Sequence, residues 1–186
     1  VSDMNYKEIP DVVAFTEKIG AIAFNLYFLV CTGRGQGNTD ISNEAYEEAL
    51  KMLQGKSIIN SINLEDGEVR FEQVVPLAKR YGAALVVGCI DDDPIQAQAI
   101  TRDRKLEVAI RSHQLLTGKY GVPEEDIIFD ALVFPAGTGD QNYVGSAAET
   151  IAGIRLIKDA LPKTKTILGI SNVSFGLPPV GREVFN

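Results

Sequence analysis

The chain has 186 residues, of which 45% are hydrophobic and 23% charged, a composition that excludes a disordered or fibrous chain. Lys and Arg number 18 against 25 Asp and Glu, so the net charge is −7, and no long basic run offers a footprint for nucleic acid. At roughly 150 residues per domain, we expect residues 1–186 to form one soluble domain.

The first elements expected along the chain are a helix over residues 11–18 and an apolar strand over 19–30. The apolar run is shorter than the ~20 residues that cross a bilayer, and no basic segment typical of a signal peptide precedes it. A glycine-rich connecting loop at 31–38 lacks the Lys-Ser/Thr pair of a Walker motif, and a helix pattern follows over 41–54. We therefore expect a cytoplasmic protein that does not contact membranes.

Strands and helices alternate through the rest of the chain. Four apolar runs have the length and composition of strands, at residues 56–62, 83–90, 126–134 and 165–171. With the run at 19–30 they make about five strands, and because no hairpin signal separates them, we expect a parallel sheet with right-handed crossovers. The helix over 101–120, which Thr101 can cap, is expected to bury Leu106, Ala109, Ile110, His113 and Leu116.

Two α/β architectures have such a sheet. A doubly wound sheet fits into 186 residues, whereas a closed (β/α)8 barrel usually needs ~250. A doubly wound protein would concentrate its binding signal in one glycine-rich turn, but here polar residues follow four successive strands, at 60–63, 91–93, 130 and 171–174. This spread favours the barrel.

The polar residues at the strand ends are carboxylates and carboxamides, with no histidine pair, cysteine nucleophile or metal-binding cluster beside them. Such groups suit a flat heterocycle, because a carboxylate accepts two adjacent N–H groups and an amide both donates and accepts. A pterin has an edge of this kind. Cys31 and Cys89 belong to no zinc motif and are expected to be free, buried thiols.

Five segments together resemble the pterin-binding domain of cobalamin-dependent methionine synthase and the related methyltetrahydrofolate:corrinoid methyltransferases. They are KSIINSINLEDGE (56–68), RYGAALVVGCIDDD (80–93), TRDRKLEVA (101–109), DIIFDALVFPAGTGD (126–140) and ILGISNVSFGLPPVGREVFN (167–186). The resemblance implies a (β/α)8 TIM barrel that holds 5-methyltetrahydrofolate at its carboxyl-terminal mouth. It also implies a methyltransferase activity, in which the N5 methyl group passes to cobalamin, as cob(I)alamin, carried by a separate corrinoid-binding domain or protein.

The resemblance implies a role for each matching residue. Asn60 and Asp130 match positions that face the pyrimidine part of the pterin, and Asn172 matches the catalytic residue that faces N5. Asn172 would hydrogen-bond the N5 region as positive charge develops there, while solvent supplies the proton. The other implied pterin contacts are a close backbone approach at Gly169 and Ser171, acids at Asp91 and Asp40, and a basic residue at Arg182.

Parts of the family pattern are missing. Residues 1–42 resemble the family only loosely, and the chain stops before the last barrel strand, so an incomplete barrel is expected, with self-association through its open edges. A non-catalytic folate-binding remnant remains open as an alternative. A dihydropteroate synthase-like enzyme is the other alternative, but it would need a Lys and a Ser-x-Arg motif near the last strands, and the segment ISNVSFG (170–176) has neither.

Overall fold

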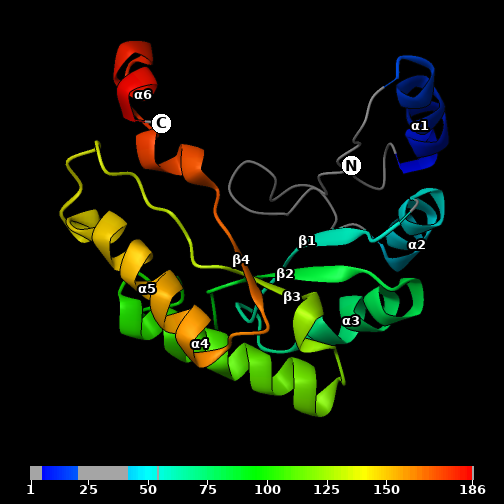
Figure 1. The fold of residues 1–186 in the computed structure, drawn as a ribbon, viewed down its shortest axis with the longest axis horizontal. Coiled ribbons are helices and arrows are strands. Elements are labelled where there is room, and N and C mark those ends of the chain that lie inside the picture. Colours follow the sequence, from blue (N-terminus) through cyan, green and yellow to red (C-terminus); the bar gives the residue numbers. More distant parts are fainter. Residues whose placement is uncertain (1–5, 21–41, 54, 186) are drawn as a thin grey trace. The chain divides into compact units, whose positions relative to one another are not determined.

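Figure 1 shows the computed structural model, in which residues 6–20, 42–53 and 55–185 are described. The chain divides into two compact units. One consists of Val1–Ser57 with Pro76–Ala83, and the other of Ile58–Val75 with Ala84–Asn186. Most of the expected strand over 19–30, the glycine-rich loop, Cys31 and Asp40 lie outside the described residues.

The first unit contains two helices that the sequence predicts, α1 (Ile9–Lys18) and α2 (Asn43–Met52), which pack against each other. Helix α2 begins after Ser42, whose hydroxyl accepts a hydrogen bond from the Ala45 N–H at 3.3 Å and so satisfies one unpaired donor of the first turn. The core positions of α2 recur at helical spacing, at Ala45, Tyr46, Ala49 and Leu50.

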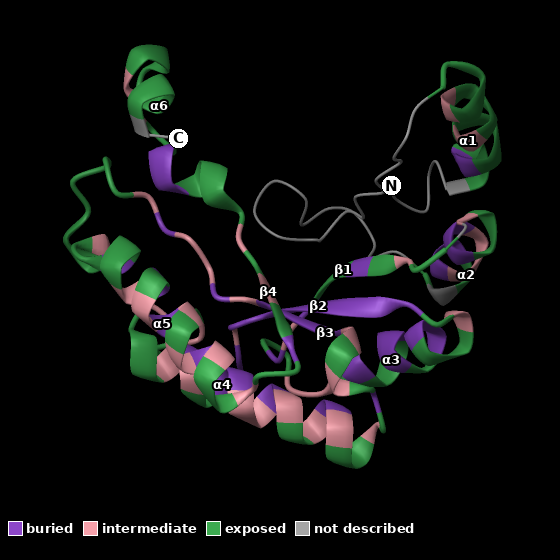
Figure 2. Ribbon diagram, viewed as in Figure 1, coloured by how far each residue is buried: buried purple, intermediate pink, exposed green. Residues whose placement is uncertain are grey.

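The second unit is built on a sheet of four parallel strands in the order β1-β2-β3-β4. The strands are β1 (Ile58–Ile62), β2 (Ala84–Gly88), β3 (Ile127–Asp130) and β4 (Lys165–Ile167). Each lies inside a run that the sequence predicts as a strand, and the parallel pairing is confirmed. Every residue of β2 is buried, as Figure 2 shows, which agrees with its continuous apolar sequence and its place between two neighbours.

Helices connect the four strands in chain order. They are α3 (Val69–Tyr81), whose residues to Val75 belong to this unit, α4 (Arg102–Gln114) and α5 (Ser146–Ala160). A further helix, α6 (Pro179–Phe185), follows β4. Helices α4 and α5 lie side by side (Figure 1). A π-helical turn over Leu115–Lys119 continues α4 to nearly the predicted end.

The buried face of α4 differs from the prediction. Ala109 and Leu116 are buried as expected. The other residues predicted to be buried are only half-buried, namely Leu106, Ile110 and His113. The buried positions of the helix are instead Lys105, Val108, Ala109 and Ser112. The helix is therefore rotated by about one residue from the most apolar register, and it carries a lysine into the core.

The two faces of the sheet differ in burial, and the strand register assigns each residue to a face. On one face the side chains are at most 3% exposed, at Ile59, Leu85, Val87, Ile127 and Phe129. The other face has a small buried cluster of Ala84, Val86 and Ile128. It also carries exposed residues, with Ile58 at 57% and Ile167 at 43%. The predicted site residues Asn60 and Asp130 lie on this second face, so their side chains point away from the main core.

Candidate functional site

Backbone hydrogen bonds join the loops that follow neighbouring strands. Because all four strands are parallel, their carboxyl ends share one edge of the sheet. The predicted residues that end or follow these strands are therefore held near a single edge. Three joining bonds, each 3.0 Å long, run from the N–H of Leu64 to the carbonyl of Ile90, from Cys89 to Asp130, and from Ala136 to Val173.

Asn60 and Asp130 lie on the same face of the sheet. Asn60 pairs in register with Val86, which pairs with Ile128, and Asp130 follows Ile128 by two residues. Both side chains thus project from the more exposed face. The partner of Asp130 on the adjacent strand is Gly88, which places no side chain beside the carboxylate. The space over Gly88 is bordered by the side chains of Ile90 and Asn63, which would lie 3.7 and 3.8 Å from a Cβ atom there.

The Asp130 carboxylate is half-buried and only partly occupied by hydrogen bonds. One oxygen, Oδ1, accepts a hydrogen bond from the N–H of Leu132 at 3.0 Å. Burial raises the pKa of the Asp130 carboxyl, while the Leu132 N–H and the positive charge of Lys105 act in the opposite direction. Within residues 55–185, the second oxygen has no hydrogen-bond donor, so it is available to a ligand.

Asn172 lies in a 3-10 turn, Ile170–Ser174, that follows β4. Its backbone N–H donates to the carbonyl of Gly169 at 3.0 Å, which closes the turn. A Cβ atom at Gly169 would lie 3.3 Å from the Asn172 side-chain nitrogen, so the exposed amide folds back over this glycine. Ser171 is also exposed, and its carbonyl accepts the hydroxyl of Ser174 at 3.1 Å.

The loop after β3 reaches the segment that carries Asn172. Besides the bond between Ala136 and Val173, the backbone at Gly137 lies directly against the side chain of Leu177. A Cβ atom at Gly176 would lie 3.4 Å from Thr138. The structure therefore joins the loop that follows Asp130 to the segment of Asn172, two residues that are far apart in the sequence.

Asp91 has a different environment from Asp130. It is 3% exposed, and its two oxygens bind arginines of α4, with Oδ1 2.5 Å from Arg104 and Oδ2 3.1 Å from Arg111. Its Oδ1 also accepts the N–H of Asp93 at 3.2 Å. These contacts give the carboxylate a structural role, and a contact between Asp91 and a pterin stays a prediction.

Of the other predicted contacts, Arg182 is exposed on α6. Cys89 is free and buried, as predicted, and burial raises the pKa of its thiol to about 12, which removes it as a nucleophile. Among the described residues there is no group of three metal-binding side chains. No helix in the described ranges is long and apolar enough to span a membrane.

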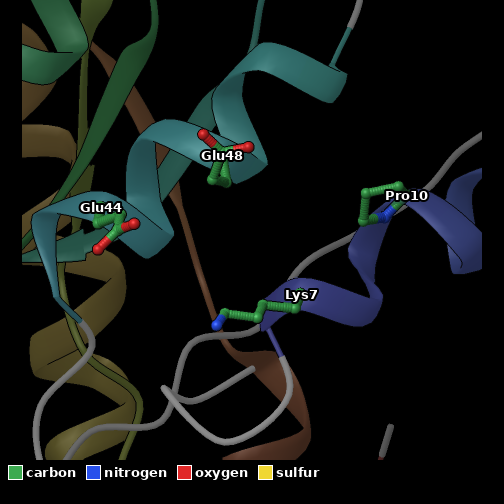
Figure 3. A pocket seen from close by; sticks show the side chains of 4 residues that line it. All are labelled: Lys7, Pro10, Glu44 and Glu48. Carbon is green, nitrogen blue, oxygen red and sulfur yellow. The ribbon is translucent and has the colours of Figure 1, made fainter.

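A hollow of about 260 Å³ lies in the first unit (Figure 3), where Lys7, Pro10, Glu44 and Glu48 line it. It is formed by the N-terminal turn, α1 and α2, and none of the predicted strand-end residues belongs to it. Three of its four lining residues are charged. It is therefore a surface feature separate from the candidate site.

Lys105 and Thr150 were not predicted to belong to the site. The ammonium of Lys105 donates to the carbonyls of Ala131 at 2.5 Å and Leu132 at 3.3 Å, and the hydroxyl of Thr150 donates to Leu132 at 2.9 Å. One sequence signal was available, because Lys105 stands at helical spacing from the small or apolar residues Val108, Ala109 and Ser112. A lysine within such a pattern can be buried when carbonyls satisfy its donors.

Polar side chains at the carboxyl ends of successive parallel strands are the arrangement with which α/β enzymes bind small molecules. The chain belongs to the pterin binding enzyme family, which matches residues 41–185. Over 143 residues it is 41% identical to the methionine synthases of Mycobacterium tuberculosis (strain ATCC 25618 / H37Rv) and of Mycobacterium leprae (strain TN). These alignments cover 75% of this chain, and the chain spans 12% of the length of either curated relative. The resemblance read from the sequence is thus confirmed, while closure of the sheet into a barrel stays a prediction.

Proposed function

We propose that this chain binds 5-methyltetrahydrofolate at the carboxyl edge of its sheet and presents the N5 methyl group to cobalamin, as the folate module of methionine synthase does. The proposal rests above all on one observation. In a chain of the pterin-binding family, Asp130 keeps a carboxylate oxygen available on the face that it shares with Asn60.

Each residue has a role that its chemistry supports. The carboxylate of Asp130 accepts N–H groups from the pyrimidine edge of the pterin, and the amide of Asn60 can both donate and accept there. The amide of Asn172, beside Gly169, hydrogen-bonds the N5 region. Because N5 becomes positive as it is protonated, this contact strengthens in the transition state and lowers the barrier.

The Cys89 thiol is fully buried and has a raised pKa, so it cannot accept the methyl group at this edge. In keeping with the family resemblance, the methyl acceptor in this proposal is external to the chain. When cob(I)alamin is brought by a corrinoid-binding partner, it supplies the nucleophile, and this chain only has to bind, orient and activate the folate.

Calorimetric titration of the purified chain with 5-methyltetrahydrofolate tests the binding step. We expect Asp130→Asn to weaken binding by ~1–3 kcal/mol, because the amide replaces an acceptor pair with a mixed donor and acceptor and leaves a pterin N–H unpaired. Asp159→Asn, an exposed carboxylate change on α5, is the matched control and should bind as the wild type does. Absence of wild-type binding at millimolar ligand contradicts the proposal.

Transfer to cob(I)alamin, followed by its absorbance, separates chemistry from binding. We expect Asn172→Ala to slow transfer by about 10²–10³, as for loss of a preorganised transition-state contact, with a smaller change in affinity. Equal losses of rate and affinity would mean that Asn172 only binds the substrate.

Binding without transfer is a second candidate, and the exposure of the site face favours it. Ile58 and Ile167, which flank the strand positions of Asn60 and Asp130, are 57% and 43% exposed. A site open to water binds a heterocycle less tightly and excludes water poorly during transfer. The titration and the transfer assay together distinguish these functions, because the binding candidate predicts affinity without any methylation of cobalamin.

A further inference from the structure

Lys105 is a buried charge that the proposed function has not yet used. Its side chain is 0% exposed, yet its ammonium makes no ion pair among the described residues. It donates instead to three backbone carbonyls, those of Ala99 at 2.8 Å, Ala131 at 2.5 Å and Leu132 at 3.3 Å. A lysine that satisfies all three of its donors on carbonyls organises the backbone around it.

That backbone includes an unusual residue. Leu132 has a φ of +60°, in the left-handed region that costs a non-glycine residue about 1 kcal/mol. Its N–H donates to the Asp130 carboxylate at 3.0 Å, and its carbonyl accepts from both Lys105 and Thr150. The turn that orients the Asp130 side chain therefore depends on contacts from α4 and α5.

The packing around Lys105 leaves its side chain little freedom. A Cβ atom at Gly153 of α5 would lie 2.7 Å from the Lys105 Cδ, so the glycine makes room for the aliphatic stem. The ammonium lies 5.0 Å from the centre of the Phe134 ring, within the range of a cation–π contact. Phe134 in turn stacks on Tyr143, with ring centres 5.1 Å apart.

We propose that Lys105 is a positioning residue for the pterin site, because it holds residues 131–132 in the turn that fixes the orientation of the Asp130 carboxylate. One carboxylate oxygen is tied to Leu132, and the other is thereby kept available for the ligand. The inference rests on the proposed function for its ligand, but the hold on the turn can be measured without any ligand.

Several ionisable groups act on Lys105. Burial lowers the pKa of its ammonium to about 8, and Cys89 on the loop after β2, Asp130 on β3 and Glu149 on α5 each act to raise it. Above pH 8 the amine is neutral and has one N–H donor fewer. The hold on the turn then weakens, whereas the cost of burying a charge disappears. Rising pH should therefore reduce ligand affinity while the fold becomes more stable.

Amide hydrogen exchange at Leu132 tests the hold on the turn in the free protein. We expect two variants to speed exchange of the Leu132 N–H by about tenfold or more: Lys105→Met, which keeps the apolar stem, and Thr150→Val. Each removes a hydrogen bond to the Leu132 carbonyl, so the turn opens at a lower cost in free energy. Exchange at the β2 amides should not change. The matched controls are Ser112→Ala on α4 and Ser146→Ala on α5, which remove buried hydroxyls without hydrogen-bond partners.

Titration with 5-methyltetrahydrofolate tests the consequence for the site. We expect the wild-type affinity to fall as pH rises through about 8. Lys105→Met should show no such fall, and at pH 7 it should bind about tenfold more weakly than the wild type. Unchanged exchange at Leu132, or a pH step that persists in Lys105→Met, overturns the inference. Should Lys105→Met fail to fold, Thr150→Val and the wild-type pH profile decide the same question.

The two proposals fail in different ways. If the wild type binds no 5-methyltetrahydrofolate, the proposed function is wrong, and exchange at Leu132 alone decides whether Lys105 holds the turn. If the wild type binds and the variants bind equally well, the function stands and the positioning role is wrong.

Discussion

Two aspartates at the ends of neighbouring strands, Asp91 after β2 and Asp130 at the end of β3, have opposite environments. Asp91 is 3% exposed, and both of its oxygens bind arginines. Asp130 is half-buried, and only one of its oxygens has a donor among the described residues. The same residue type near the ends of two neighbouring strands thus stabilises the fold in one case and keeps an oxygen without a donor in the other.

Helix α4 creates this difference. Arg104 and Arg111, seven residues and about two turns apart, reach the same carboxylate of Asp91. Lys105, which follows Arg104 in the helix, reaches the loop after β3. There its ammonium binds the carbonyls of Ala131 and Leu132 and not the Asp130 carboxylate. A cation that binds the backbone fixes the position of a carboxylate without pairing with it. Arginines that pair with a carboxylate occupy its oxygens, so these cannot accept hydrogen bonds from a ligand.

The largest effect on this comparison is expected from Asp91→Ala. The change leaves Arg104, whose side chain is 12% exposed, without its closest partner, and removing one member of a buried ion pair costs about 3–5 kcal/mol. Urea unfolding measures the loss. Asp92→Ala removes an exposed carboxylate that binds the same Arg111 and should cost much less. Equal losses would show that Asp91 is no more structural than a surface group.

A smaller loss is expected from Gly153→Ala, which disturbs Lys105 without altering any polar group. Alanine favours a helix over glycine by about 1 kcal/mol, but here its Cβ would lie 2.7 Å from the Lys105 stem. Overpacking of this kind costs about 1–3 kcal/mol, so the variant should be no more stable than the wild type. Thermal unfolding measures this, with Gly118→Ala, where a Cβ meets nothing within 4 Å, as the control. A more stable Gly153→Ala variant would contradict the close packing.

The pH dependence of Lys105→Met sharpens the comparison further. The folded state lowers the pKa of Lys105 to about 8 from its ordinary value of 10.5, so the unfolded chain binds more protons between these values. The unfolding free energy of the wild type should therefore rise from pH 8 to 10.5 relative to that of the methionine variant. Denaturation curves of both proteins across this range test the sign, and parallel curves would mean that Lys105 titrates normally.

The smallest effect is expected from the ionisation of Asp130. Because burial raises its pKa above the ordinary value of 3.8, the folded state favours the protonated carboxyl. The wild type should lose a little stability as pH rises from 3.8 through the raised pKa, and Asp130→Asn should lack this loss. Urea unfolding between acid and neutral pH measures the difference. A variant that is less stable than the wild type at neutral pH would indicate that the charged carboxylate stabilises the fold.

The sequence predicted much of the architecture, because that part depends on local patterns. The apolar run of β2 and the helical spacing in α2 and α5 each specify an element, and the absence of hairpin turns specified parallel pairing. The motifs predicted Asn60, Asp130 and Asn172 at strand ends, but Asn60 is the middle residue of β1, whereas Asp130 ends β3 and Asn172 follows β4. The register puts Asn60 and Asp130 on one face. Their contacts with a pterin stay predictions.

The buried face of α4 was harder to predict. Leu106 and Ile110 are more apolar than Lys105, so a pattern of hydrophobic residues favours a register that the protein does not adopt. Burial of Lys105 becomes favourable because its ammonium meets the carbonyl of Ala99, just before α4, and that of Ala131 in the distant loop after β3, while Gly153 makes room for its stem. No local pattern contains that information.

The sequence by itself determined the order of the elements, the parallel sheet and the family to which the chain belongs, since periodicity and motifs are properties of neighbouring residues. Only the tertiary structure decided which strand-end carboxylate is saturated and which remains available. That choice depends on which cation of α4 faces each loop, and a rotation of the helix by one residue moves a side chain by about 100° around its axis.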